Sequence, residues 1–233
     1  MNIISKCRGR DKIGHMLNSM NLTGVGVEVG TNRGIFAEQL LRTWRGTILH
    51  CIDPYIKNYD SQDPVSQQVE RDSDLFEFAS RMANFIGLGR CQLHRNTSRM
   101  VLDSELFKDN SLDFVYVDAC HQYYSTLEDL TGWFKKVRVG GVIAGHDWVC
   151  PYDDTGGWAR TVQPAISEFL RSAYSTEDGE LARNLIPVYV ITEPGDSPWS
   201  YYLIKKEEYI TEISIPDNWS QNLATYTAKL KSK

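Results

Sequence analysis

The sequence lacks several features that would place it at once in a protein class. Its five cysteines include no CxxC pair, which argues against a zinc ribbon or a dithiol redox centre. Isolated thiols favour a reducing, cytoplasmic compartment. No apolar run approaches the roughly 18 residues of a membrane span, and no secretory leader is recognisable. The net charge of -5 and the absence of a dense Lys/Arg run make nucleic acid or a membrane an unexpected partner.

What remains is the composition of an ordinary folded domain. The chain has 233 residues, of which 42% are hydrophobic and 24% charged. A chain of this length can bury a core without disulfide or metal staples. We therefore expect one domain over residues 1–233, with a helical lead over 1–23, a core over 24–205 and a peripheral polar tail over 206–233.

Short strand patterns alternate with helical patterns along the core. One helix is expected to carry Leu127, Leu130, Phe134 and Val137 on one stripe and to end at Gly140. Two further strand-like runs, LIPVYVIT and WSYYLIKK, are joined by a turn. These features predict a Rossmann-like, doubly wound α/β fold with a mainly parallel seven-stranded sheet and an antiparallel C-terminal hairpin. Strands are expected at 25–29, 47–52, 91–94, 112–119 and 142–145.

The stretch EVGTNRG follows the first of these strands. Glu28 closes the strand, and Gly30 and Gly34 allow a sharp turn into a helix. Asp53 closes the second strand, where a carboxylate can accept hydrogen bonds from ribose hydroxyls. The turn has one glycine fewer than the dinucleotide fingerprint, and an acid beside it disfavours a phosphate. It suits a cationic group such as an amine or a sulfonium.

A second group of polar residues follows the fourth and fifth strands. Asp118 and His121 belong to VDACHQY, and His146 and Asp147 belong to GHDW. Because neighbouring parallel strands end at one edge of a sheet, we expect these side chains to meet beside the glycine turn. Carboxylates and imidazoles of this kind can hold a divalent metal, and a histidine can accept a proton near neutral pH.

The first pattern, acid-x-Gly-x-x-x-Gly with an acid closing the second strand, resembles class I S-adenosylmethionine-dependent methyltransferases. The resemblance covers roughly residues 24 to 170. It implies S-adenosylmethionine as cofactor. The residues that it implies for cofactor binding are Glu28, Gly30, Thr31, Asn32, Gly34, Asp53, Ser98 and Asp118.

The second pattern resembles metal-dependent O-methyltransferases of small molecules, particularly those that methylate sugar hydroxyls. It implies Mg²⁺ or Mn²⁺ bound by Asp118, His146 and Asp147, with His121 as general base. The family has Glu or Asp where this chain has His146, so a softer ion or no metal at all stays open. A small-molecule or glycan acceptor is implied, against which Trp148, Tyr152 and Trp158 could stack. A homodimer is a further option.

Two other functions fit the same fold. An NAD-linked oxidoreductase would use the same sheet edge, although the missing turn glycine counts against it. A non-catalytic module that binds a sugar or another small molecule would keep the fold alone. The clustered acids and histidines favour an enzyme, because a binding module has no need of them.

Overall fold

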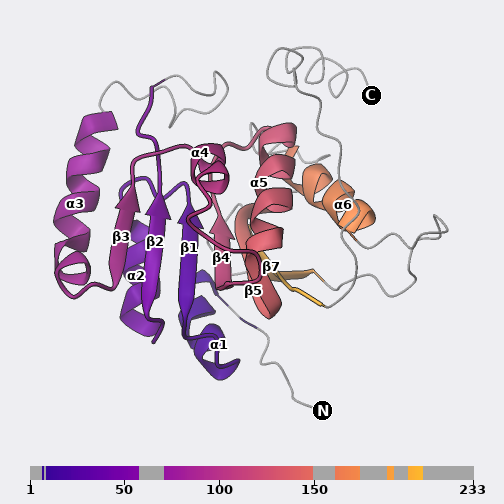
Figure 1. The fold of residues 1–233 in the computed structure, drawn as a ribbon, viewed down its shortest axis with the longest axis horizontal. Helices are drawn as coiled ribbons and strands as arrows, with labels where there is room; N and C mark the ends of the chain where they lie inside the picture. The colour runs from indigo at the N-terminus through magenta and orange to yellow at the C-terminus, as the bar shows by residue number, and fades with distance from the viewer. Residues whose placement is uncertain are drawn as a thin grey trace.

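The structure is a computed structural model, which describes residue 7 and residues 9–57, 71–148, 161–173, 188–191 and 199–206 (Figure 1). Tyr152 and Trp158, which were expected to stack on the acceptor, lie outside these residues. The predicted tail beyond Lys206 also lies outside them. Within the described part, no helix is long and apolar enough to cross a membrane. The division of the chain into one domain with a lead and a tail stays a prediction.

A seven-stranded sheet forms the centre, in the order β3-β2-β1-β4-β5-β7-β6 (Figure 1). The first five strands are parallel, and β7 pairs antiparallel with both β5 and β6. This confirms the predicted fold class, including the C-terminal hairpin. The strands are β1 (Val25–Val29), β2 (Ile48–Ile52), β3 (Cys91–His94), β4 (Leu112–Val117), β5 (Val137–Trp148), β6 (Tyr189–Ile191) and β7 (Trp199–Ile204).

Helices cover both faces of the sheet, as the doubly wound pattern requires. One apolar cluster joins the sheet to α1 (Ile13–Ser19), α2 (Ile35–Thr43) and α3 (Arg71–Gly87), and the short helix η1 (Arg10–Lys12) precedes α1. The other cluster joins it to α4 (Ser98–Asp103), α5 (Tyr123–Lys136) and α6 (Val162–Ala173). Strand β4 is buried along its whole length, which explains why its sequence is a continuous apolar run.

Strand alternation decides which side chains of β1 face each layer. Val27 and Val29 belong to the cluster beneath α4, α5 and α6. Glu28 points to the opposite side, where Cys51 of β2 lies 3.8 Å from its carboxylate. The register pairs Glu28 with Tyr116 of β4, so the ends of β1 and β4 meet at one edge.

Three predicted boundaries are wrong. The fourth strand ends at Val117 rather than at 119, and the fifth continues to Trp148 rather than to 145. The third is the boundary between the helix and the fifth strand. Helix α5 ends at Lys136, and Val137 already begins β5, where it pairs with Leu112. Glycines therefore do not stop the helix; they lie inside the strand, where Gly140 has φ +77° and the β4–β5 register shifts. The buried Lys205 amine, just after β7, donates to the carbonyls of Phe134 and Val137 and so satisfies the end of α5.

Candidate active site

The turn after β1 needs glycine at two positions. Gly30 has φ +86°, and a Cβ there would lie 2.0 Å from the carbonyl oxygen of Asp118. Gly34, with φ +73°, precedes α2, and a Cβ there would lie 2.8 Å from the Phe78 ring. The Gly30 amide also donates to the Ile52 carbonyl at 2.8 Å. These contacts hold the turn against the ends of β2 and β4 and leave no room for a side chain.

Glu28 is buried at the carboxyl end of β1, with 2% of its surface exposed. Its Oε2 accepts a hydrogen bond of 2.7 Å from the Thr31 hydroxyl within the same turn. Burial raises the pKa of Glu28 to about 8, although the Thr31 bond and the charge of Arg10 oppose that rise. A cationic group bound nearby would stabilise the ionised carboxylate and lower that pKa.

Asp53 lies directly after β2 and is also buried. Its Oδ2 accepts from the Asn32 amide at 2.9 Å, and its Oδ1 accepts from the Tyr55 amide at 2.8 Å and from Arg71 at 2.9 Å. A carboxylate has about four acceptor positions, so these three bonds leave one on Oδ2 for a ligand hydroxyl. The structure thus fixes Asp53 beside the turn that contains Asn32.

Sequence reasoning missed Arg71. This arginine begins α3, is 2% exposed, and also pairs with Asp74 at 2.8 Å and with the Asn32 side chain at 3.2 Å. Arg71 thereby connects the turn after β1, which contains Asn32, to the loop after β2, which contains Asp53. The spacing of three residues between Arg71 and Asp74 could suggest an ion pair within one helix. The bond to Asp53 spans 18 residues, and no local pattern in the sequence indicates it.

The ends of β4 and β5 bring Asp118, His121 and Asp147 together. His121 Nε2 lies 2.7 Å from Asp147 Oδ2 and 3.9 Å from Asp118 Oδ1. His146 contacts the other oxygen of Asp147, at 3.3 Å from its Nδ1. The prediction that these four side chains share one sheet edge is therefore confirmed in position, although their chemical roles are not tested by it.

The backbone and charges of this cluster are unusual. Asp147 has φ +63° while 3% exposed, a strained conformation of the kind found at functional sites. Burial lowers the pKa of His121, but the charges and hydrogen bonds of Asp147 and Asp118 outweigh it and raise that pKa to about 10. The pKa of Asp147 is correspondingly lowered by the two histidines, against the opposing effect of burial.

Arg10 is a second residue that sequence reasoning missed. Its Nη2 lies 2.7 Å from Asp118 Oδ2, and its guanidinium lies 4.6 Å from the Phe36 ring centroid and 5.2 Å from that of Tyr116. The partner Asp118 is 108 residues away, so no local spacing signals the pair. The N-terminal lead thereby contributes a charged side chain to the edge where β1 and β4 end.

Ser98 was predicted to bind the cofactor. It begins α4, where its hydroxyl donates to Asp129 of α5 and accepts from the Trp133 indole at 2.8 Å. These bonds tie α4 to α5 and use the hydroxyl for packing. A cofactor role of Ser98 stays a prediction, and the geometry gives it no separate support.

The predicted metal ligands were Asp118, His146 and Asp147, but the group whose donor atoms converge is Asp118, His121 and Asp147. Its atoms lie within 4.8 Å of one another. However, Asp118 is already paired with Arg10, and the hydrogen bond between His121 and Asp147 uses the atoms that would bind a cation. As placed, these donors do not fit a divalent metal without rearrangement. Metal binding stays a prediction.

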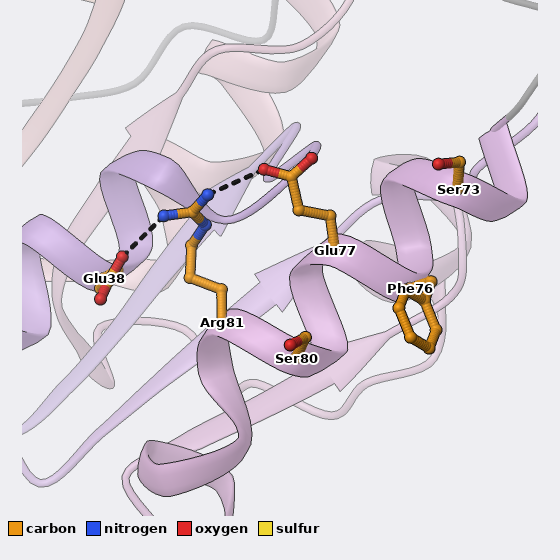
Figure 2. Close-up of a pocket in the computed structure, with 6 residues that line it drawn as sticks. All are labelled: Glu38, Ser73, Phe76, Glu77, Ser80 and Arg81. Atoms are coloured by element: carbon orange, nitrogen blue, oxygen red, sulfur yellow. Dashed lines mark hydrogen bonds and ion pairs between the residues drawn. The ribbon is translucent and has the colours of Figure 1, made fainter.

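A surface groove between α2 and α3 is separate from this edge (Figure 2). Figure 2 shows that Arg81 lies between Glu38 and Glu77. Its Nη1 is 2.9 Å from Glu38 Oε2, and its Nη2 is 2.8 Å from Glu77 Oε1. The groove shares none of the residues described above, so it does not define the candidate site. Its lining residues are Glu38, Ser73, Phe76, Glu77, Ser80 and Arg81.

The fold and the side chains described above define an α/β protein with a candidate ligand site at the carboxyl edge of its parallel strands. The profile of a family described as "Methyltransferase domain" matches residues 27–148, which include Glu28, Asp53 and the whole acid-histidine cluster. The chain belongs to this family. The prediction of a class I S-adenosylmethionine-dependent methyltransferase is thereby confirmed, and the oxidoreductase alternative is set aside.

Solved structures share the fold at low sequence identity. An O-methyltransferase from Bacillus cereus in complex with S-adenosylhomocysteine has 12% identity and a TM-score of 0.58, covering 84% of this chain and 80% of that one. The O-methyltransferase TomG from Streptomyces achromogenes, involved in tomaymycin synthesis and solved with S-adenosylmethionine, has 16% identity and a TM-score of 0.57, covering 87% and 82%.

An rRNA methylase from Streptococcus thermophilus is also similar, with 11% identity, a TM-score of 0.50 and coverage of 81% and 92%. A search of curated protein sequences finds no match. At these identities the structures establish the fold alone. The acceptor must therefore be inferred from the residues of this chain.

Proposed function

We propose that the protein transfers the methyl group of S-adenosylmethionine to a hydroxyl of a sugar or a related small molecule. One observation carries this proposal: the His121–Asp147 pair lies at the same sheet edge as the Gly30 turn. The turn suits a cationic cofactor, and the pair suits removal of a proton from an alcohol. The rest of the site supports one or the other of these tasks.

The cofactor would lie across the ends of β1 and β2. Asp53 would accept a ribose hydroxyl at its remaining position on Oδ2, because its other bonds hold the carboxylate still. Glu28 would stabilise the positive charge of the amine or the sulfonium. This arrangement would place the activated methyl group near Asp118, whose backbone touches the Gly30 turn.

Methyl transfer would then be an in-line displacement. The acceptor oxygen forms a bond to the methyl carbon as the carbon–sulfur bond breaks, and the hydroxyl proton passes to His121. The neutral ring of His121 would take that proton, and the imidazolium that forms would keep its contact with Asp147. Asp147 would hold the ring orientation and stabilise the imidazolium that forms.

The raised pKa of His121 has a consequence for this step. At neutral pH the ring is mostly protonated in the cofactor-free protein. A sulfonium bound at the same edge would add a like charge and lower that pKa, so cofactor binding would favour the neutral, proton-accepting form. Turnover should therefore increase as the pH rises toward 10.

The choice of a small acceptor rests on two features. The net charge of -5 disfavours a polyanion such as RNA, even though one structural neighbour is an rRNA methylase. Trp148 ends β5 directly beside Asp147 and is only partly buried, so its ring could stack on a sugar. Two of the similar structures are O-methyltransferases, one of them involved in tomaymycin synthesis, which agrees with a hydroxyl acceptor.

The test is a methyl-transfer assay on a panel of glycosides and phenols, read as a mass increase of one methyl group. His121→Ala should lower kcat roughly 100- to 10,000-fold, the usual contribution of a general base, while the affinity for S-adenosylhomocysteine stays the same. The matched control is the exposed His15→Ala. Unchanged turnover in His121→Ala would contradict the base; transfer to RNA but to no small molecule would contradict the acceptor class.

A further inference from the structure

The N-terminal lead places a permanent positive charge inside the acid cluster. Arg10 is 25% exposed in its side chain, and Asp118, its partner at 2.7 Å, is 21% exposed. Arginine stays charged at every physiological pH. Asp118 therefore has a cation beside it in the protein's own sequence.

Packing holds this arginine in one place. Its guanidinium lies over the rings of Phe36 from α2 and Tyr116 from β4, which stack on each other with centroids 4.1 Å apart. The Tyr116 hydroxyl is in turn hydrogen-bonded to Ser200 of β7 at 3.0 Å. Cation–π contacts of this kind are strongest where water is excluded.

The charges of the cluster are compensated by pairs within it. Asp118 pairs with Arg10, and Asp147 pairs with His121 at 2.7 Å and with His146 at 3.3 Å. Carboxylates gathered in a low-dielectric site repel one another unless a cation compensates them. In metal-dependent enzymes a divalent ion supplies that charge; here a side chain is in position to supply it.

We propose that Arg10 takes the place of a divalent metal ion at this site, so that the transfer reaction proceeds without one. Arg10 is a positioning residue: it fixes Asp118 and offsets its charge but does not touch the reacting atoms. The proposal rests on the methyl-transfer function above, and it departs from the metal site that the sequence resemblance implies.

The first measurement does not depend on activity. Mn²⁺ is titrated into the full-length protein and followed by electron paramagnetic resonance of the free ion. Wild-type protein should show no saturable site at the cluster. Arg10→Met keeps the length of the side chain and removes its charge, and it should gain a saturable Mn²⁺ site that wild type lacks, at least tenfold tighter than the weakest binding that the titration can detect.

Two variants serve as matched comparisons. Lys12→Met removes a positive charge from the same short helix, but the Lys12 side chain is 57% exposed and pairs with Asp11 rather than with the cluster. It should behave as wild type. Arg10→Lys keeps the positive charge and should also show no gain in Mn²⁺ binding, which separates charge from shape if Arg10→Met folds poorly.

The second measurement is turnover with excess EDTA and then with added Mg²⁺ or Mn²⁺. Wild-type turnover should change less than twofold, whereas Arg10→Met should lose roughly 100-fold and recover part of it with the metal. A saturable Mn²⁺ site in wild type that Asp118→Asn removes would overturn the proposal. So would EDTA inactivation reversed by metal, or Arg10→Met without any gain in Mn²⁺ binding. If wild type transfers a methyl group to none of the acceptors, the proposed function is contradicted. The Mn²⁺ titration does not depend on activity, so it would still test the role of Arg10.

Discussion

The two halves of the candidate site are built in different ways. At the ends of β1 and β2, the site consists of a glycine turn and two buried acids, which accept hydrogen bonds from backbone amides and from neighbouring side chains. At the ends of β4 and β5, it consists of charged side chains that compensate one another, one of them from 108 residues away. The first half depends on backbone shape and the second on charge balance, so substitutions should affect them differently.

The largest effect on the first half is expected from Gly30→Ala. The new methyl group would lie 2.0 Å from the Asp118 carbonyl oxygen, so the turn or the end of β4 must move. We expect the affinity for S-adenosylhomocysteine, measured by calorimetry, to fall roughly 100-fold, as for other overpacked sites.

Gly89→Ala is the matched control for this substitution. Gly89 also has a positive φ, +69°, but a Cβ there would meet nothing within 4 Å. It should lose stability through backbone strain alone and keep the cofactor affinity of wild type. Equal losses of affinity in the two variants would show that the turn after β1 has no special part in cofactor binding.

A smaller effect is expected from Asp53→Asn. The amide keeps the shape of the side chain but loses the charge that Arg71 faces, and it presents hydrogens to donors. We expect cofactor affinity to fall roughly 30-fold, with kcat at saturating cofactor nearly unchanged. The control is Asp72→Asn, an exposed acid of α3. A fall in kcat with unchanged affinity would place Asp53 in the reaction half instead.

The smallest effect is the pH dependence that Glu28 gives to cofactor affinity. Because the pKa of Glu28 is raised to about 8, binding of a cationic cofactor requires proton release below that pH. Cofactor affinity should therefore be about tenfold weaker at pH 7 than at pH 9. Calorimetry in two buffers of different ionisation enthalpy would count the protons released on binding, and Glu28→Gln should release about one fewer than wild type.

The raised pKa of Glu28 also makes the stability of the folded protein depend on pH. The folded protein binds a proton at Glu28 that the unfolded chain has already lost, so its contribution is complete below pH 4.5 and disappears as the pH rises through 8. The melting temperature of wild type should therefore fall more over this range than that of Glu28→Gln. Identical pH profiles of the two proteins would contradict a raised pKa for Glu28.

The first half of the site could be predicted because its signals are local. Glu28, Gly30 and Gly34 lie within seven residues, and each glycine has the positive φ that the turn requires. The fold class followed from the alternation of strands and helices. The boundary at Val137 could not be placed, because an apolar residue one turn beyond Phe134 fits a helix stripe as well as a strand.

The second half could be predicted only as a set of residues. The strand ends gave Asp118, His121 and Asp147, since parallel neighbours end at one edge. The ion pairs among these residues could not be predicted. The His121–Asp147 pair depends on the side-chain geometry at the end of β5, and Arg10 is 108 residues from Asp118 in the sequence. A metal was therefore expected where the structure places an arginine.

The most direct test of the account is a crystal structure of the protein with S-adenosylhomocysteine. The account predicts the ribose at Asp53, the amino acid part of the ligand over Gly30 beside Glu28, and the sulfur facing the His121–Asp147 pair. A ligand bound elsewhere, such as in the groove between α2 and α3, or an empty crevice above Glu28 at saturating ligand, would contradict it.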